Sequence, residues 1–370
     1  MTDSADSVAA TRNLVRYSDN VEDPKPDEDE VIDKIVERLH RNNVRAFKIY
    51  KHAIRDAHAK SHGVLRGELT ADPDLAVHLR QGMFATPTTY PVIARLSSTP
   101  GMIRSDQVPG VRAIALKVFG VHGPRARDDG NTTQDYVMVN HPQFPTADAH
   151  AYLKKGMPFN DFLVRTPDRA LRLIAGSLRG PASLIKRSGL SLPALVALFT
   201  EPNNYILGQT FHTAAPVRYG DFVAKISVTP LSPSVKQFVD RAVPRSGGDD
   251  AQRDMVGDFF PNNSAEYEMR AQLCEAPIGD KIEDATVVWP ERQERIATIT
   301  FPAQNADGLW RRVYADDVLS FNSWNTLEAH RPLGSINRLK LKVYKASSEY
   351  RHAMNKAPSK EPTSIDELPD

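Results

Sequence analysis

The sequence has little that would cross-link it covalently or place it in a membrane. Of its 370 residues only Cys274 is a cysteine, so no intrachain disulfide can form, which fits a reducing compartment. No run of about 18 apolar residues is present, so we expect no membrane-spanning helix. The N-terminus lacks the basic and then apolar segments of a secretory signal. These absences predict a cytoplasmic protein.

Charge of one sign is not in excess either. Lysine and arginine number 47 and aspartate and glutamate 46, so the net charge is +1 and gives no reason to expect a nucleic acid as partner. The sequence also lacks the phosphate-loop pattern G-x-x-x-x-G-K-[ST], the dinucleotide pattern G-x-G-x-x-G and the nucleophile elbow G-x-S-x-G. Nothing in it therefore points to a nucleotide-binding protein or to a serine hydrolase.

What is present is an ordinary globular composition, with 41% hydrophobic and 25% charged residues. The length allows one large domain or two smaller ones, and we expect a single domain over residues 30–354. The polar composition of residues 1–29 predicts a flexible arm, and that of residues 355–370 a flexible tail. Residues 147–204 read as a helical insertion within the domain.

The apolar pattern predicts an α+β fold with a β-rich centre. Apolar residues recur close to a 3.6-residue period in residues 31–57, and a second long helix is expected after Gly334. Several short segments rich in β-branched residues alternate apolar and polar positions, as half-buried antiparallel strands do. These segments are residues 91–98, 112–119, 135–140, 221–229, 266–273 and 295–301.

Two histidines precede the first strand-like segment and leave three readings open. His58 and His62 are four residues apart, as zinc-binding pairs are, but no glutamate lies between them and Gly63 would end a helix there. A histidine in this place is most often a structural or surface residue. It can also be the acid–base group of an active site, since its pKa lies near working pH.

The segment H-A-K-S-H-G-V-L-R-G-E-L-T (residues 58–70) resembles the distal segment of haem catalases. Further catalase-like segments follow in the same order along the chain, and the resemblance extends over most of residues 41–351, weakly between 147 and 204. These segments are R-L-S-S (95–98), R-A-I-A-L-K-V-F (112–119), D-Y-V-M-V-N-H-P-Q-F-P (135–145), residues 208–229 and V-W-P-E-R (288–292). The resemblance implies a closed antiparallel β-barrel of about eight strands, with flanking helices and haem between barrel and helices.

The resemblance implies roles on the distal face of the haem. His58 corresponds to the histidine that moves the peroxide proton, and Ser97 could orient its imidazole. The distal asparagine of catalases lies in a G-N-N-T-P segment, which corresponds here to D-G-N-T-T-Q-D-Y (129–136). This register puts Thr132 at the asparagine position, with Asn131 adjacent. Phe144 is expected to pack on the porphyrin.

On the proximal face the resemblance implies a tyrosine as the iron ligand. D-V-L-S-F-N (317–322) resembles a catalase segment before the haem helix, and in this register Tyr344 falls at the ligand position. Arg351 follows seven residues later, as in the family. Lys340 stands where catalases have an arginine, so it can supply a cation but not a forked hydrogen bond. The arginines that hold the haem propionates correspond to Arg55, Arg95 and Arg351.

The function implied is haem-dependent breakdown of hydrogen peroxide, of the catalase or peroxidase type. Two alternatives stay open: a peroxidase or isomerase that acts on organic or lipid hydroperoxides, and a non-catalytic haem-binding protein. The chain is short for a catalase, which is a feature of the small catalase-related haem proteins. Catalases are usually tetramers, so the resemblance implies that this chain associates with copies of itself as a homo-oligomer.

Overall fold

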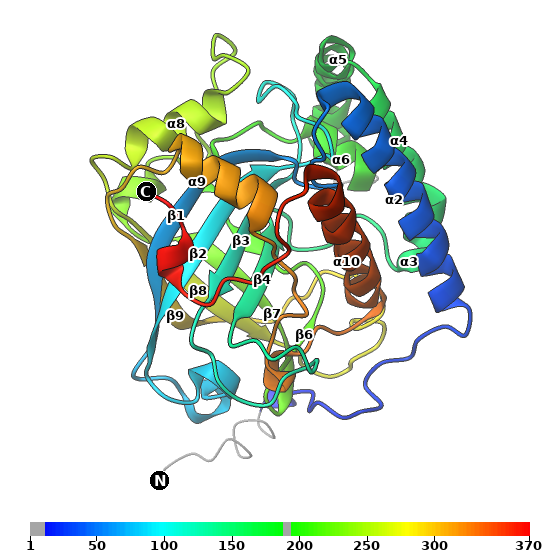
Figure 1. The fold of residues 1–370 in the computed structure, drawn as a ribbon. Helices are drawn as coiled ribbons and strands as arrows, with labels where there is room; N and C mark the ends of the chain where they lie inside the picture. The colour runs from blue at the N-terminus through cyan, green and yellow to red at the C-terminus, as the bar shows by residue number, and fades with distance from the viewer. Residues whose placement is uncertain (1–11, 188–193) are drawn as a thin grey trace.

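A closed barrel of eight antiparallel strands forms the centre of the computed structural model, which describes residues 12–187 and 194–370 (Figure 1). Each strand pairs with the next around the barrel, and the ring closes where β5 bridges β4 and β7. The strands of the ring are β1 (Lys60–Ala71), β2 (Thr89–Ser98), β3 (Arg112–Val118), β4 (Gln134–Val139), β5 (Phe211–His212), β7 (Phe222–Pro230), β8 (Ala265–Leu273) and β9 (Gln293–Phe301). β6 (Val217–Tyr219) pairs with β7 outside the ring. The predicted eight-stranded antiparallel barrel is confirmed.

Buried and less buried residues alternate along the strands, and the buried side chains fill the barrel. In β8 every second residue from Ala265 to Leu273 is buried and the intervening residues are half-buried. Inward-facing residues such as Tyr267, Met269 and Phe301 belong to one apolar core cluster that runs through the barrel. β3 differs, because all of its residues are buried. Other parts of the chain therefore cover its outer face as well as its inner one.

Helices cover one side of the barrel (Figure 1). The longest are α2 (Glu28–Tyr50) and α10 (Ser335–Asn355), which pack together through one apolar cluster that includes Ile35, Leu39 and Leu339. A helical layer between β4 and β5 consists of α3 (Ala149–Ala151), the π-helix η3 (Tyr152–Gly156), α4 (Met157–Arg165), α5 (Asp168–Arg187) and α6 (Ala194–Thr200). The other α-helices are α7 (Pro233–Lys236), α8 (Ala251–Phe259) and α9 (Leu309–Val313), and a second π-helix is η5 (Tyr314–Val318).

The first long helix ends earlier than its apolar period suggests. The expected run continues to residue 57, whereas α2 stops at Tyr50 and Lys51 adopts the left-handed conformation, with φ 56°. The Lys51 amide still bonds the carbonyl of Phe47, which closes the last turn. Residues 52–59 consequently form an irregular connection between α2 and β1, and His58 lies on this connection. None of the described helices is long and apolar enough to cross a bilayer.

Both ends of the described chain contact the barrel. Arg12 pairs with Glu275 and Glu294 near the start. In the tail, Leu368 is fully buried and Glu361 pairs with the buried Lys117 of β3. Composition predicts that both segments are flexible. The side chains named here nevertheless contact the barrel or are buried, and composition alone does not predict these contacts.

A buried ion pair lies on the outer face of β3 and β4. Lys117 and Asp135 are both fully buried and lie 2.8 Å apart. Burial alone would lower the pKa of Lys117, but the carboxylates of Asp135 and Glu361 raise it. We predict that Lys117→Ala lowers the free energy of unfolding by about 3–5 kcal/mol, because Asp135 would be left as an uncompensated buried charge. Urea denaturation measures this change.

The exposed Lys236 of α7 offers a matched control. Lys236→Ala should change the free energy of unfolding by no more than about 0.5 kcal/mol, as is usual at the surface. Equal stabilities for the two variants would show that the pair does not stabilise the fold.

Candidate functional site

His58 lies on the irregular connection before β1, and its backbone conformation is unusual. Its φ is 52°, in the left-handed region that a non-glycine residue rarely adopts. A strained backbone of this kind typically costs about 1–3 kcal/mol and persists only where neighbouring groups hold it. Here Arg95 of β2 donates from Nη1 to the His58 carbonyl at 3.0 Å. The His58 side chain lines a cavity beside the barrel.

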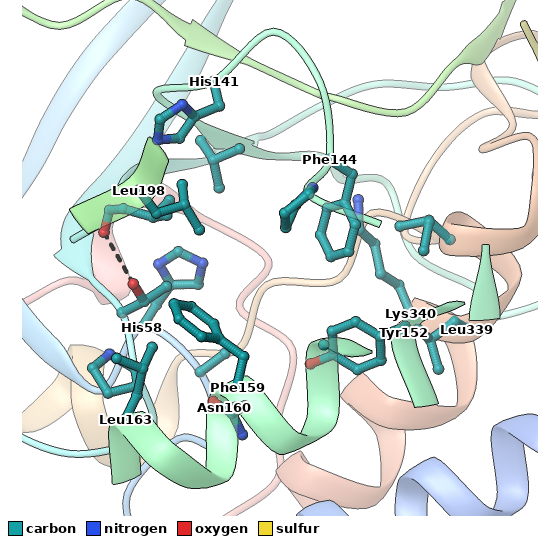
Figure 2. A pocket seen from close by; sticks show the side chains of 18 of the residues that line it. His58, His141, Phe144, Tyr152, Phe159, Asn160, Leu163, Leu198, Leu339 and Lys340 are labelled. Carbon is teal, nitrogen blue, oxygen red and sulfur yellow. Dashed lines mark hydrogen bonds between the residues drawn. The ribbon is translucent and has the colours of Figure 1, made fainter. Parts of the chain in front are cut away.

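Two cavities meet beside this imidazole. The larger has a volume of about 450 Å³ and the smaller about 90 Å³. Asp56, Ala57, His58 and Tyr344 line both. Figure 2 shows His58 at one side of the larger cavity and Lys340 of α10 across from it. The structure therefore brings the predicted distal histidine and the predicted iron ligand to one connected space.

The surroundings of the His58 imidazole favour its uncharged form. Its Nδ1 is buried and has no hydrogen-bond partner. Burial, together with the positive charges of Arg95, Lys340 and Arg55, lowers its pKa to about 3. A neutral ring with a free nitrogen can accept a proton. Ser97 lines the smaller cavity beside it, but no hydrogen bond joins the two side chains.

Tyr344 is on α10 and lines both cavities. Burial raises the pKa of its phenol, and the nearby Asp56 and Tyr152 raise it further. Asp56 is itself held by Ser347, whose Oγ donates to Asp56 Oδ1 at 2.7 Å. In these surroundings the phenol is protonated at neutral pH. A bound metal ion would be needed to ionise it.

Lys340 lies one helical turn before Tyr344 but is not bonded to the phenol. Its Nζ donates to Asn337 Oδ1 at 3.1 Å. The side chain lines the larger cavity and, in Figure 2, extends toward Phe144. Burial lowers the pKa of Lys340 to about 8, so its charge is poorly solvated there. Phe144 lines the same cavity and packs against Tyr152, with ring centroids 5.9 Å apart.

Three arginines meet at the smaller cavity, and their guanidinium groups bond one short segment, residues 315–320. Arg55 donates from Nη2 to the carbonyls of Ala315 and Leu319, each at 2.6 Å. Arg351 donates from Nη1 to the carbonyls of residues 316 and 317, and Arg95 lines the same space. The three predicted propionate-binding arginines, from three separate elements, are thus brought together.

Three arginines gather in this cluster, and the carboxylates of Asp316, Asp317 and Asp56 lie close enough to act on their charge. The side chain of Asp316 contacts Arg95 at 3.0 Å and Arg55 at 3.3 Å. Burial and the charges of Arg95 and Arg351 lower the pKa of Arg55 well below its ordinary value. A buried cluster of like charges is stabilised by an anion with suitable geometry, and arginine suits carboxylates. One end of the connected space is therefore built to receive anionic groups.

Asn131 and Thr132, the predicted peroxide-positioning residues, lie away from this space. They precede β4, whose first residue Gln134 pairs with Val118 and whose last residue Val139 pairs with Ala113. The two cavities touch β4 at Val137 and Val139, so three strand residues, about 10 Å, separate Gln134 from the nearer of these contacts. Thr132 is exposed, and neither residue lines a cavity. The structure thus places Asn131 and Thr132 outside the two cavities, and their role in positioning peroxide stays a prediction.

His62 contacts a different set of groups from His58. Its Nε2 bonds Ser98 Oγ, and its Nδ1 lies 3.8 Å from Asp106 Oδ2 inside the barrel wall. The described residues contain no group of three histidine, cysteine, aspartate or glutamate side chains that could hold a metal ion. His62 is thus a buried structural histidine, and the structure gives no support to a zinc pair.

Sequence reasoning missed several residues of the site. Asp56 lies between Arg55 and His58 in a segment already singled out, so a carboxylate beside the predicted distal histidine could have been noticed. His141 and Glu201 line the larger cavity and lie 3.6 Å apart, but they are 60 residues apart in sequence. No sequence pattern joins them, since the helical layer between β4 and β5 brings them together.

Comparison with solved structures identifies the architecture. Catalase A from Saccharomyces cerevisiae aligns over 85% of this chain and 65% of its own, with a TM-score of 0.56 and 17% identity. A bacterial catalase aligns over 95% and 66%, with a TM-score of 0.56 and 15% identity. A fungal catalase aligns over 84% and 60%, with a TM-score of 0.52 and 13% identity.

The chain has a catalase-like fold. It spans less than two thirds of the length of each of these catalases. No protein-family model matches the sequence, and no curated protein matches it. The catalase-like fold expected from the sequence segments is thereby confirmed at the level of architecture.

The arginine cluster predicts a salt-dependent stability of the haem-free protein. Asp316→Asn removes the carboxylate that contacts Arg55 and Arg95. We expect a loss of about 1–2 kcal/mol in the free energy of unfolding at low salt, since hydrogen bonds to charged groups contribute about this much. The loss should shrink in about 1 M salt, where the screening length is about 3 Å. Urea titrations at the two salt concentrations measure both effects.

Asp258→Asn on the exposed surface of α8 is the matched control. It should have little effect at either salt concentration. If Asp316→Asn proved as stable as the parent at low salt, the cluster would not depend on that carboxylate.

Proposed function

We propose that the protein binds haem and breaks down peroxide, with Tyr344 as iron ligand and His58 as the group that moves the proton. The observation that supports this most is the arrangement of His58 and Tyr344 on two connected cavities that end at three arginines. A histidine, a tyrosine or a group of arginines beside a cavity is common when it occurs alone. Their combination on a catalase-like barrel is what favours a peroxide-consuming oxidoreductase.

The residues present fit haem. The larger cavity offers apolar side chains for the macrocycle, among them Phe144, Ile336 and Leu339. Arg55, Arg95 and Arg351 would hold the two propionates, because guanidinium groups pair well with carboxylates. When bound, haem would supply a ferric iron able to exchange electrons with peroxide, and an anionic phenolate ligand would favour that chemistry.

His58 would act as the base. Its imidazole is neutral at working pH, and its unpaired Nδ1 is free to accept a proton from peroxide and return it. Ser97, in the smaller cavity beside it, would limit the rotation of the ring. Arg95 would hold the backbone of His58 in place through the carbonyl contact.

Tyr344 would have to lose its phenolic proton to bind iron. Lys340 could stabilise the resulting phenolate from one turn away on α10, but only by giving up its present bond to Asn337. A lysine supplies a point charge in place of the planar fork of an arginine.

The first test is the absorption spectrum of the protein produced with adequate haem. The parent should show a Soret band with the high-spin pattern of a phenolate-ligated ferric haem, and Tyr344→Phe should alter it. Tyr350→Phe is the control, since Tyr350 lies on the same helix but contacts His40 outside the cavities. A parent protein without a Soret band would end the haem proposal.

The pKa of His58 predicts how peroxide consumption depends on pH. A histidine with an ordinary pKa of about 6.5 would be protonated below that pH and inactive as a base. With its pKa lowered to about 3, His58 stays neutral down to much lower pH. The initial rate of the haem-loaded protein should therefore be nearly constant between about pH 5 and pH 8.

His58→Asn should lower that rate at every pH by about 10²–10⁴-fold, the usual contribution of a general base. A fall in the parent's rate centred near pH 6.5 would contradict the assignment of a neutral His58.

A second candidate is a peroxidase or isomerase for organic hydroperoxides. The size and apolar lining of the larger cavity favour it, as does the absence of Asn131 from the site. Comparing kcat/KM for cumene hydroperoxide and for hydrogen peroxide would separate the two. If haem-loaded protein consumed neither and oxidised no reductant, the non-catalytic haem-binding alternative would replace both.

A further inference from the structure

The outer face of α5 presents apolar side chains to solvent. Leu173 is 75% exposed and Leu184 is 65% exposed. Gly176 and Gly180 lie between them on the same face, and a methyl group added at either would meet no atom within 4 Å. Two leucines and two bare glycines thus form an open apolar stripe, which a helix of a globular protein would normally bury.

The opposite face of the same helix is well packed. Leu171 and Ala175 are buried in a cluster with Phe199 of α6, and Phe159 of α4 packs against that cluster. Phe159 also lines the larger cavity. The exposed stripe is therefore not a sign of a misplaced helix. It is the outer surface of a helical layer whose inner residues, among them Phe159, line the larger cavity.

Positive charge accompanies the stripe. The sequence of α5 holds five basic residues and one acidic residue, Asp168. That acid is already paired with Arg104 at 2.8 Å. Arg169 is exposed on the same face as Leu173. Across residues 147–204 the sequence has eight basic and four acidic residues, so this segment carries +4 in a chain whose total is +1.

We propose that the outer face of α5 docks on an anionic lipid surface. Leucine side chains would enter the interface between headgroups and acyl chains while arginines contact the headgroup phosphates, as amphipathic basic helices do. A second copy of the chain fits less well, because two such faces brought together would oppose like charges. Docking would place the cavity wall one helical layer from the membrane.

Docking would also bring apolar hydroperoxides formed in lipid close to the larger cavity. This consequence rests on the proposed function, whereas the docking itself does not. The two can be tested apart, because vesicle binding needs neither haem nor peroxide.

Vesicle co-sedimentation of the full chain tests the proposal. We expect binding to vesicles of equal parts phosphatidylglycerol and phosphatidylcholine, weakening in high salt, and little binding to phosphatidylcholine alone. Arg169→Gln should lower the partition coefficient about fivefold, which is the share of one basic residue near an anionic surface. Leu173→Ser with Leu184→Ser should lower it at least about tenfold, since two large apolar side chains no longer insert.

Two control variants carry the same changes elsewhere. Leu309→Ser with Trp310→Ser removes an apolar pair on α9, where these residues are 61% and 69% exposed. Lys236→Gln removes an exposed cation on α7. Both should bind vesicles as the parent does. Unfolding temperatures of all variants should match the parent, because the changed side chains face solvent.

Three results would overturn the proposal. The first is that the parent does not bind the anionic vesicles. The second is that the α5 variants bind them as well as the parent does. The third is that the parent forms a dimer in solution, which the leucine variant dissociates, and does not bind vesicles. The dependence of the parent on lipid charge and salt decides the matter even if a variant folds poorly.

Discussion

The bonding of three buried guanidinium groups to residues 315–320 is the constraint on which the site depends. Arg55 comes from the connection before β1, Arg95 from β2 and Arg351 from α10. Through this segment the barrel is tied to the helix that carries Tyr344. The same Arg95 bonds the carbonyl of His58. One set of guanidinium contacts therefore joins the segment that carries His58 to the helix that carries Tyr344.

Much of the barrel could be predicted because alternating burial leaves a trace in each strand. Residues 266–273 alternate in sequence, and β8 alternates in burial. β5 could not be predicted in this way, because its two residues are too few to show an alternating pattern. It pairs with β4 and β7 because the closed ring brings these strands beside it. The early end of α2 was missed for a related reason: Ile54 continues the apolar period, but a left-handed Lys51 has already turned the chain.

The site residues were predicted from segments that resemble catalases in the same order, and the structure brings His58, Tyr344 and the three arginines to one space. Tyr344 and Arg351 share one helix, so their spacing of seven residues fixes their relative places. Asn131 and Thr132 lie in a loop, where the alignment of residues in sequence does not determine the direction that the chain takes. Local charge was missed for a different reason. A net charge of +1 conceals a positive helical layer, because acidic residues elsewhere in the chain offset it.

The short strand β5 has a consequence for how this architecture can change. The whole helical layer lies between β4 and β5, and β5 contributes only three residue pairs to the ring. The layer is held from outside by side-chain bonds, such as Arg104 to Asp168 and Arg112 of β3 to Asn203, while the three arginines of the cluster bond residues 315–320 instead. The outer wall of the larger cavity, with the face of α5, is thus a replaceable module. Altering it can change which molecules reach His58 while the frame that holds the histidine stays the same.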